Sequence, residues 1–336
     1  MWANNLRVFA VFAVIVLHTA SGFISSIEMT DPNYGNYDWW AGNFFDSITR
    51  WCVPLFVMIS GYFLLCKEEA NIVFFRKRVN KILIPILFWS FIFSLWVLLI
   101  AYVRGDIEQG YKEIVRSVAL GRPYFHLWYL FMIPLLYIIT PILRLCLSTW
   151  GKSEILFFIL FSFFLAAINV LFNNVSPDLS VKPEVTLFTN VFLSYIGYYL
   201  LGGYINRFQI KTNSKICITV LFVSLLITIL GSYFFFYKYF YSYLSLNVIL
   251  ASVSLFLLIK KHININLKLS HASKLSFGIY LVHPIFLDIF SFLAKHSFLS
   301  TINIFWYIPL FSVIVFISSY ITVIIMSKTK YISKCI

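Results

Sequence analysis

The sequence predicts an all-α fold, a polytopic bundle of about ten transmembrane helices with both termini in the cytoplasm. Of the 336 residues, 61% are hydrophobic and only 12% are charged, whereas soluble domains average roughly 45–50% and about 25%. The hydrophobic residues form unbroken runs such as 82–101, long enough for spanning helices of about 20 residues and unlike the alternating strands of a membrane barrel. The basic residues gather in alternate connections. These observations exclude a water-soluble enzyme.

Breaks rich in charged, Pro, Gly or Asn residues separate the expected spans, with the least distinct boundary at the turn 237–239. The first span resembles the core of a signal peptide. However, Arg7 is the only charge before it and no small-residue cleavage pattern follows, so we expect an uncleaved helix. With no repeat or linker in the sequence, residues 1–336 are treated as one membrane-embedded domain. The expected spans are 6–24, 42–65, 80–103, 126–147, 154–172, 187–205, 216–236, 240–259, 275–294 and 303–326.

The distribution of basic residues predicts the orientation. With the N-terminus inside, the expected inner connections and C-terminal tail hold 17 of the 26 Lys and Arg residues, against 7 in the outer connections. This positive-inside bias places both termini in the cytoplasm. It also accounts for the net charge of +13, so no nucleic-acid partner is expected.

Ionisable side chains inside hydrocarbon are costly and therefore mark candidate sites. Arg7 and His18 share the first span, eleven residues apart, which places them on one helix face about 16 Å apart. A cation near the inner mouth and a titratable ring in the outer half would then line one stripe. The alternatives are that Arg7 reaches the inner headgroups and that His18 only hydrogen-bonds a neighbouring helix.

The second span carries Asp46 and Arg50, four residues apart, which are expected to form an ion pair. Their estimated depth matches that of His18, which favours a shared cavity. A purely structural pair remains the alternative, because pairing is how a helix bundle tolerates buried charge.

Three further candidates lie on later spans. His283 is expected near the middle of the ninth span, where it serves either the site or helix packing. His126 and Trp128 open the fourth span at the outer interface, where Trp commonly only anchors a helix.

A basic cluster precedes the third span and includes Arg76, Arg78 and Lys81. Positive-inside charge explains it in part. Its guanidinium and ammonium groups also suit a diphosphate or nucleotide phosphate at the mouth of a bundle. None of the five Cys residues shows a CxxC or CxxH spacing, so neither a disulfide framework nor a metal site is expected.

Five stretches occur in the order that is typical of one family. They are Leu6-Arg7 with His18 eleven residues after the Arg, Pro54–Tyr62 (PLFVMISGY), the basic cluster ending in Lys81–Pro85 (KILIP), His126–Tyr129 (HLWY) and Ser276–His283 (SFGIYLVH). With them the chain resembles the acyltransferase-3 family of membrane acyltransferases along nearly its whole length. It is most similar to bacterial O-acetyltransferases of surface polysaccharides, such as O-antigen or enterobacterial common antigen.

The resemblance implies a ten-helix core in the bacterial inner membrane that takes acetyl groups from cytosolic acetyl-CoA and delivers them to a surface glycan or its lipid-linked precursor. It implies that His18 is the catalytic histidine, that Arg7 supports the acyl donor and that the cluster Arg76 to Lys81 binds the donor. Relatives often carry Arg-x-x-Arg where this chain has Arg78-Val79-Asn80-Lys81. This departure leaves open which of Arg76 and Arg78 holds the phosphate.

Transfer from a thioester to a sugar hydroxyl needs a base and a stabiliser for the developing negative charge. His18 is expected either to deprotonate the hydroxyl or to carry the acetyl group transiently. The other candidates for substrate binding or charge stabilisation are Asp46, Arg50, His126, Trp128 and His283.

Two other functions fit parts of the sequence. A transporter or flippase of lipid-linked oligosaccharide would also carry buried His, Asp and Arg residues, but no paired halves are visible. A structural subunit of an export complex would leave these residues unexplained. The sugar, its hydroxyl and the oligomeric state are not encoded in any recognisable pattern.

Overall fold

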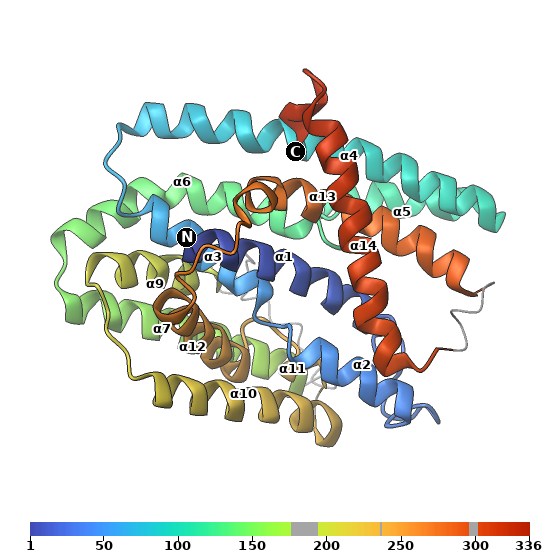
Figure 1. The fold of residues 1–336 in the computed structure, drawn as a ribbon, viewed down its shortest axis with the longest axis horizontal. Coiled ribbons are helices and arrows are strands. Elements are labelled where there is room, and N and C mark those ends of the chain that lie inside the picture. The colour runs from blue at the N-terminus through green and yellow to red at the C-terminus, as the bar shows by residue number, and fades with distance from the viewer. Residues whose placement is uncertain (176–193, 236, 296–301) are drawn as a thin grey trace.

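The computed structural model of the chain describes residues 1–175, 194–235, 237–295 and 302–336 (Figure 1). These residues form helices and connections, with no strand among them. The helices are α1 (Trp2–Ser21), α2 (Tyr37–Ser47), α3 (Cys52–Leu64), α4 (Asn71–Arg104), α5 (Ile107–Ala119), α6 (Trp128–Thr149), α7 (Lys152–Val175), α9 (Ile196–Arg207), α10 (Ser214–Phe234), α11 (Tyr237–Phe240), α12 (Leu246–His262), α13 (Ser270–Lys295), α14 (Ile304–Ser327) and the 3₁₀ turn η3 (Ile332–Cys335).

The predicted membrane-embedded helix bundle is confirmed. Among the described residues, eight segments are long and apolar enough to cross a membrane, with α2 and α3 counted together. The two remaining expected spans correspond to α12, of 17 residues, and to α9, of 12 residues. Residues 187–193 of the expected span 187–205 lie outside the described residues. The total of ten spans and the side on which the termini lie stay predictions.

The second span is not one continuous helix, contrary to our expectation for 42–65. Helix α2 ends at Ser47, a turn follows, and α3 begins at Cys52. Pro54 explains the break, because a proline in an unbroken helix removes a backbone donor and clashes with the carbonyl four residues earlier. In the first turn of a new helix the same residue is tolerated.

Two differences concern the third span and the connection that follows it. Helix α4 has 34 residues and begins nine residues before the expected 80. It includes the basic cluster, because Lys and Arg are good helix formers. The expected outer connection 104–125 contains helix α5. Gly105 adopts a left-handed conformation (φ 79°) after α4, and the Asp106 carboxylate then accepts from the Gln109 backbone N–H at 3.1 Å, a typical helix start.

The other boundaries differ by a few residues. The turn expected at 237–239 is the short helix α11, followed by a connection to α12. Helix α14 runs across α1 and α13 and packs on both (Figure 1). The η3 turn packs on α4, where the Trp89 indole N–H donates to the Cys335 carbonyl at 2.8 Å.

The connections that carry most of the basic residues lie at one end of the bundle, which we call the basic end. Hydrogen bonds join these connections to one another. The other end, at which α5 and the start of α2 lie, is called the opposite end. The bonds at the basic end are Trp2 N–H to Asn264 Oδ1 (3.3 Å), Lys261 Nζ to the Thr212 carbonyl (3.0 Å), Arg207 Nη2 to the Ser148 carbonyl (3.1 Å) and Arg144 Nε to the Leu64 carbonyl (2.9 Å).

Helices α3 and α9 pack backbone to backbone through two glycines. A Cβ atom at Gly61 would stand 1.8 Å from the Tyr199 carbonyl oxygen, and one at Gly202 would stand 2.1 Å from the Met58 carbonyl oxygen. Small residues permit such close contact between membrane helices, where association depends on van der Waals packing. This pair of helices therefore forms a tightly packed centre of the bundle.

We expect Gly61→Ala to lower the free energy of unfolding by at least about 3 kcal/mol, since the new methyl group meets backbone atoms that cannot move aside. The check is thermal unfolding of the purified protein in detergent micelles. Gly151→Ala is the matched control, because its methyl group would meet only the end of the Glu154 side chain. Equal midpoints for the two variants would contradict the proposed close packing.

Candidate active site

Three histidine rings from separate elements meet inside the bundle. His18 comes from α1, His283 from α13 and His126 from the connection before α6. The ring centroids of His18 and His283 are 5.5 Å apart and nearly parallel, and those of His126 and His283 are also 5.5 Å apart. The His18 ring also meets Phe125 edge to face at 4.8 Å. The structure thus brings together three candidates that the sequence separates by more than 250 residues.

Hydrogen bonding fixes the orientation of His283. Its Nδ1 lies 2.6 Å from the Tyr280 carbonyl oxygen, which can only accept, so Nδ1 carries a proton. Nε2 of His283 and both ring nitrogens of His126 are buried with no hydrogen-bond partner among the described residues. Buried polar atoms without partners are uncommon and often belong to functional sites. The Tyr280 hydroxyl donates to the His126 carbonyl and so links the two histidine segments.

His18 lines a cavity of about 640 Å³ near the opposite end. Its wall contains Phe125, Asp288 and Tyr307 together with several hydroxyl side chains. The volume lies within the range of about 300–1,000 Å³ that is typical of ligand sites. We call it the outer cavity.

A second cavity of about 750 Å³ opens near the basic end and is called the inner cavity. Four basic side chains line it, Arg78, Lys81, Lys274 and Lys334, and no acidic residue is among its described lining residues. The Ser60, Tyr129 and Tyr137 side chains also line this cavity. This arrangement suits an anionic ligand such as a diphosphate.

The basic cluster divides between the inner cavity and an ion-pair network. Arg78 and Lys81 line the cavity, whereas Arg76 is exposed and is not among the lining residues. Lys77 Nζ instead bonds Glu69 at 3.1 Å, together with Lys67 Nζ at 3.0 Å. Hydrogen bonds from these ammonium groups lower the pKa of Glu69 to about 2, and the carboxylate pairs with Lys77 outside the inner cavity.

The Arg78 side chain lines the inner cavity, with part of its guanidinium buried. Its guanidinium lies over the rings of Phe74 and Tyr137, at 5.5 and 5.8 Å from their centroids. Its Nε is buried with no hydrogen-bond partner among the described residues. Arg78 is therefore placed to bind an anionic ligand in the inner cavity.

Arg7 lies between the inner cavity and the histidines. Its guanidinium is half-buried over the Phe63 ring, 5.5 Å from the centroid, and within electrostatic range of Tyr129 and Tyr137. No acidic side chain pairs with it among the described residues. It is thus a cation beside the innermost residues of the inner cavity.

A short series of rings separates the two cavities, and no described residue lines both. The Tyr129 ring of the inner cavity lies 5.8 Å from the Tyr280 ring, which lies 6.0 Å from His283. His283 in turn contacts His18. Along this path, the rings of Tyr280 and His283 lie between Tyr129 of the inner cavity and His18 of the outer cavity.

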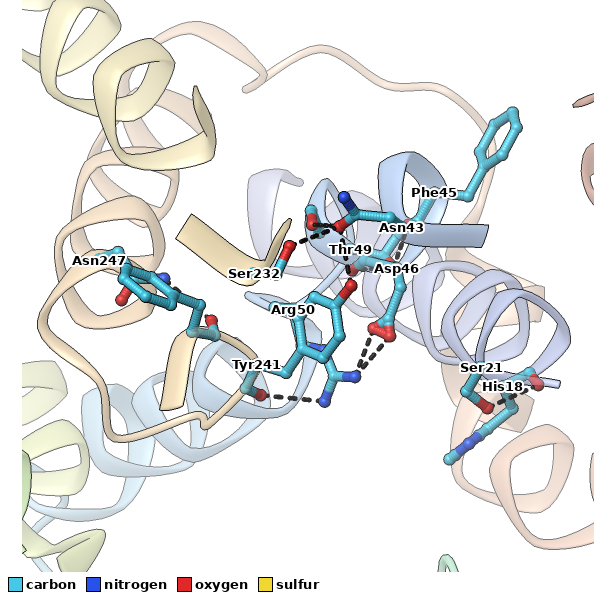
Figure 2. A network of polar contacts seen from close by, with 12 residues as sticks. His18, Ser21, Asn43, Phe45, Asp46, Thr49, Arg50, Ser232, Tyr241 and Asn247 are labelled. Atoms are coloured by element: carbon cyan, nitrogen blue, oxygen red, sulfur yellow. Dashed lines mark hydrogen bonds and ion pairs between the residues drawn. The ribbon is translucent and has the colours of Figure 1, made fainter. Parts of the chain in front are cut away.

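Asp46 and Arg50 form the expected ion pair, although the helix break lies between them (Figure 2). Arg50 Nη1 also donates to the Tyr241 carbonyl at 2.9 Å, and its guanidinium lies over the Tyr241 ring. Neither residue contacts the His18 ring directly, but Arg50 is close enough to contribute to its electrostatic field. The ion pair thus connects the turn between α2 and α3 to the segment that precedes α12.

Trp128 lies apart from the histidines. Its indole packs on Tyr195 and Tyr243, with centroids 5.6 and 5.9 Å away. Tyr243 also lies beneath the Arg50 guanidinium. Trp128 therefore belongs to the aromatic surroundings of Arg50 and not to the histidine cluster.

The comparison with protein families decides the class of chemistry. A family model described as an acyltransferase domain matches residues 2–324. The chain belongs to the acyltransferase-3 family. With its apolar helices, it is a multi-pass membrane acyltransferase. No match was found among curated proteins or among solved structures.

Sequence reasoning missed several residues of the acyltransferase site. Lys274 and Lys334 line the inner cavity but are ordinary inner-side charges in the sequence. Phe125 contacts the ring of His18, and its position just before His126 was the available signal. Asp288, an acidic residue on an apolar helix, was visible as an anomaly without a partner. Its partners, Trp96 and Tyr124, lie on other elements.

The buried ion pair gives a stability prediction. Asp46 is fully buried and Arg50 is 16% exposed, so Arg50→Gln leaves an unpaired buried carboxylate and is expected to cost about 3–5 kcal/mol. The double variant Asp46→Asn/Arg50→Gln is expected to recover part of this loss. Denaturant unfolding in micelles measures both effects.

Lys112→Gln supplies the matched control for this pair. Lys112 and Glu108 are also four residues apart, but their side chains are 68% and 81% exposed, and such pairs contribute at most about 1 kcal/mol. A loss in Arg50→Gln no larger than in Lys112→Gln would contradict the buried pair.

Proposed function

We propose that the protein is an O-acetyltransferase that moves acetyl groups from cytosolic acetyl-CoA to a hydroxyl of a cell-surface polysaccharide or of its lipid-linked precursor. On this proposal it acts in the bacterial inner membrane, with the basic end in the cytoplasm. The observation that carries the proposal is the position of His18, which lines the hydroxyl-rich outer cavity and is separated by the rings of His283 and Tyr280 from Tyr129 of the cationic inner cavity.

The inner cavity supports the donor half of the proposal. Arg78 and Lys81 would hold the phosphates of the coenzyme, with Lys274 and Lys334 adding positive charge on the same wall. The pantetheine arm would then extend past Arg7 toward Tyr129 and Tyr280. For the thioester to reach His18, the ring of Tyr280 or His283 has to move aside.

The outer cavity supports the acceptor half. A hydroxyl group bound beside His18 would give its proton to the imidazole, and its oxygen would form the new C–O bond at the thioester carbonyl. The C–S bond then breaks, and the coenzyme leaves as a thiolate that takes up the proton. If the acetyl group first forms an acetyl-histidine, the same ring is required.

The negative charge that develops on the carbonyl oxygen needs a donor nearby. Arg50 contributes to the field around His18, and His283 stacks on it. His126 supplies a further ring on the far side of His283. Of the sequence candidates, Trp128 and Asp46 are assigned a supporting role around Arg50.

We expect His18→Ala to lower the rate of acetyl transfer by at least about 10²- to 10⁴-fold, because a general base usually contributes a factor of this size. The assay uses membranes from a deletion strain, radiolabelled acetyl-CoA and the base-deacetylated surface polysaccharide of the parent strain. His262→Ala, which changes an exposed histidine bonded to Ser214, is expected to keep the parental rate. Native transfer by His18→Ala would disprove the mechanism.

Acetyl-CoA binding gives a second test of the proposal. We expect Arg78→Ala to raise the KM for acetyl-CoA about tenfold or more, because hydrogen bonds to charged groups contribute about 1.5–3 kcal/mol. Arg76→Ala is expected to raise it less, since Arg76 does not line the cavity. Lys328→Ala, a change at an exposed cation of the tail, serves as the control.

Assays on the purified protein distinguish an acyltransferase from a flippase. A purified acyltransferase is expected to bind coenzyme A and to hydrolyse acetyl-CoA slowly without an acceptor, whereas a flippase does neither. A purified protein that shows neither property, while its deletion abolishes display of the glycan, would favour the carrier.

A further inference from the structure

Asp288 places a carboxylate in the wall of the outer cavity. It lies on α13, five residues after His283, and lines the cavity that His18 also lines. No ion pair involves Asp288 among the described residues. Asp288 is half-buried, and a carboxylate without a cationic partner on a membrane helix marks a candidate site.

Two donors from different elements hold this carboxylate in one orientation. The Trp96 indole N–H of α4 donates to Asp288 Oδ2 at 2.8 Å, and the Tyr124 hydroxyl donates to the same oxygen. Phe93 stacks on the Tyr124 ring at 4.6 Å and supports it. Both donors use Oδ2, so Oδ1 has no hydrogen-bond partner in the described part of the chain.

The rest of the cavity wall indicates what Oδ1 would bind. Three of the described lining residues are titratable, namely His18, Asp288 and the phenol of Tyr307. The wall also contains four serine or threonine hydroxyl groups and four aromatic rings, which belong to Thr19, Ser21, Ser25, Ser291, Phe23, Phe125, Tyr307 and Phe311. A wall of this kind offers hydrogen bonds to hydroxyl groups and apolar faces to C–H groups, but no partner for an anion.

We propose that Asp288 positions the acceptor by accepting a hydrogen bond at Oδ1 from a second hydroxyl of the sugar ring that is acetylated. This inference rests on the proposed O-acetyltransferase function and names the class of its acceptor. The ring in the outer cavity is an uncharged sugar or an amino sugar, because the carboxylate would repel a uronic acid. Asp288 thus acts on the orientation of the acceptor, and the proton transfer belongs to His18.

The test separates the acceptor half of the reaction from the donor half. Purified wild type and Asp288→Asn are compared in two assays, slow acetyl-CoA hydrolysis without acceptor and acetyl transfer to the base-deacetylated polysaccharide of the parent strain. We expect Asp288→Asn to lower kcat/KM for the polysaccharide about tenfold, the effect of losing a charged hydrogen bond. Acceptor-free hydrolysis is expected to stay within twofold of wild type.

Three controls make the outcome specific. Glu108→Gln changes an acid with an 81% exposed side chain outside the cavity and is expected to match wild type in both assays. Tyr124→Phe and Trp96→Phe each remove one donor to Oδ2 and are expected to give smaller losses in transfer. Thermal unfolding in micelles verifies that each variant is folded.

Each result decides a separate question. Wild-type transfer by folded Asp288→Asn would overturn the role of Asp288, as would equal losses in hydrolysis and transfer. If Asp288→Asn does not fold, the comparison is made with Tyr124→Phe, and unchanged transfer by that variant overturns the proposal. Failure of the wild type to hydrolyse acetyl-CoA would instead contradict the proposed function.

Discussion

The arrangement of the bundle depends on two cavities of opposite electrostatic character that approach one cluster of histidine rings. The inner cavity carries four cations, whereas the outer cavity carries the Asp288 carboxylate and no Lys or Arg among its described lining residues. Charged groups in hydrocarbon are retained where they serve a pathway or a site. On the proposed function, this contrast would sort the two ligands by charge, with His18 in the wall of the outer cavity.

The surrounding fold holds the histidine cluster by rigid contacts. The glycine contacts between α3 and α9 fix two central helices at backbone distance. The Tyr280 hydroxyl joins α13 to the connection that carries His126. Phe93 packs on both His126 and Tyr124, which links the cluster to the support of Asp288. Catalytic geometry is precise only when such neighbours lock the side chains that perform the reaction.

Much of this arrangement follows from the sequence, for identifiable reasons. Hydropathy predicts membrane helices because an apolar environment demands long apolar segments with internal hydrogen bonds. The Asp46–Arg50 pair follows from a spacing of four residues, and it survives the break that Pro54 causes. The break itself could have been read from that proline, and α5 from its apolar residues at helical spacing after the N-cap Asp106.

The site was less predictable because its contacts join distant parts of the chain. Periodicity places Arg7 and His18 on one helix but does not show that His18 meets His283 and Phe125. Nor does it show that Glu69 binds Lys77 while Arg78 lines the cavity. Trp128 is a further example, because its position in the motif does not show that its side chain packs on Tyr195 and Tyr243.

The length of α4 has a mechanical consequence. Its 34 residues extend about 50 Å, well beyond a hydrocarbon layer of about 30 Å. Arg78 near one end lines the inner cavity and Trp96, about 27 Å further along the axis, bonds Asp288 in the wall of the outer one. One helix thus contributes to both cavities, and a tilt or bend at Pro85 would displace Arg78 and the support of Asp288 together.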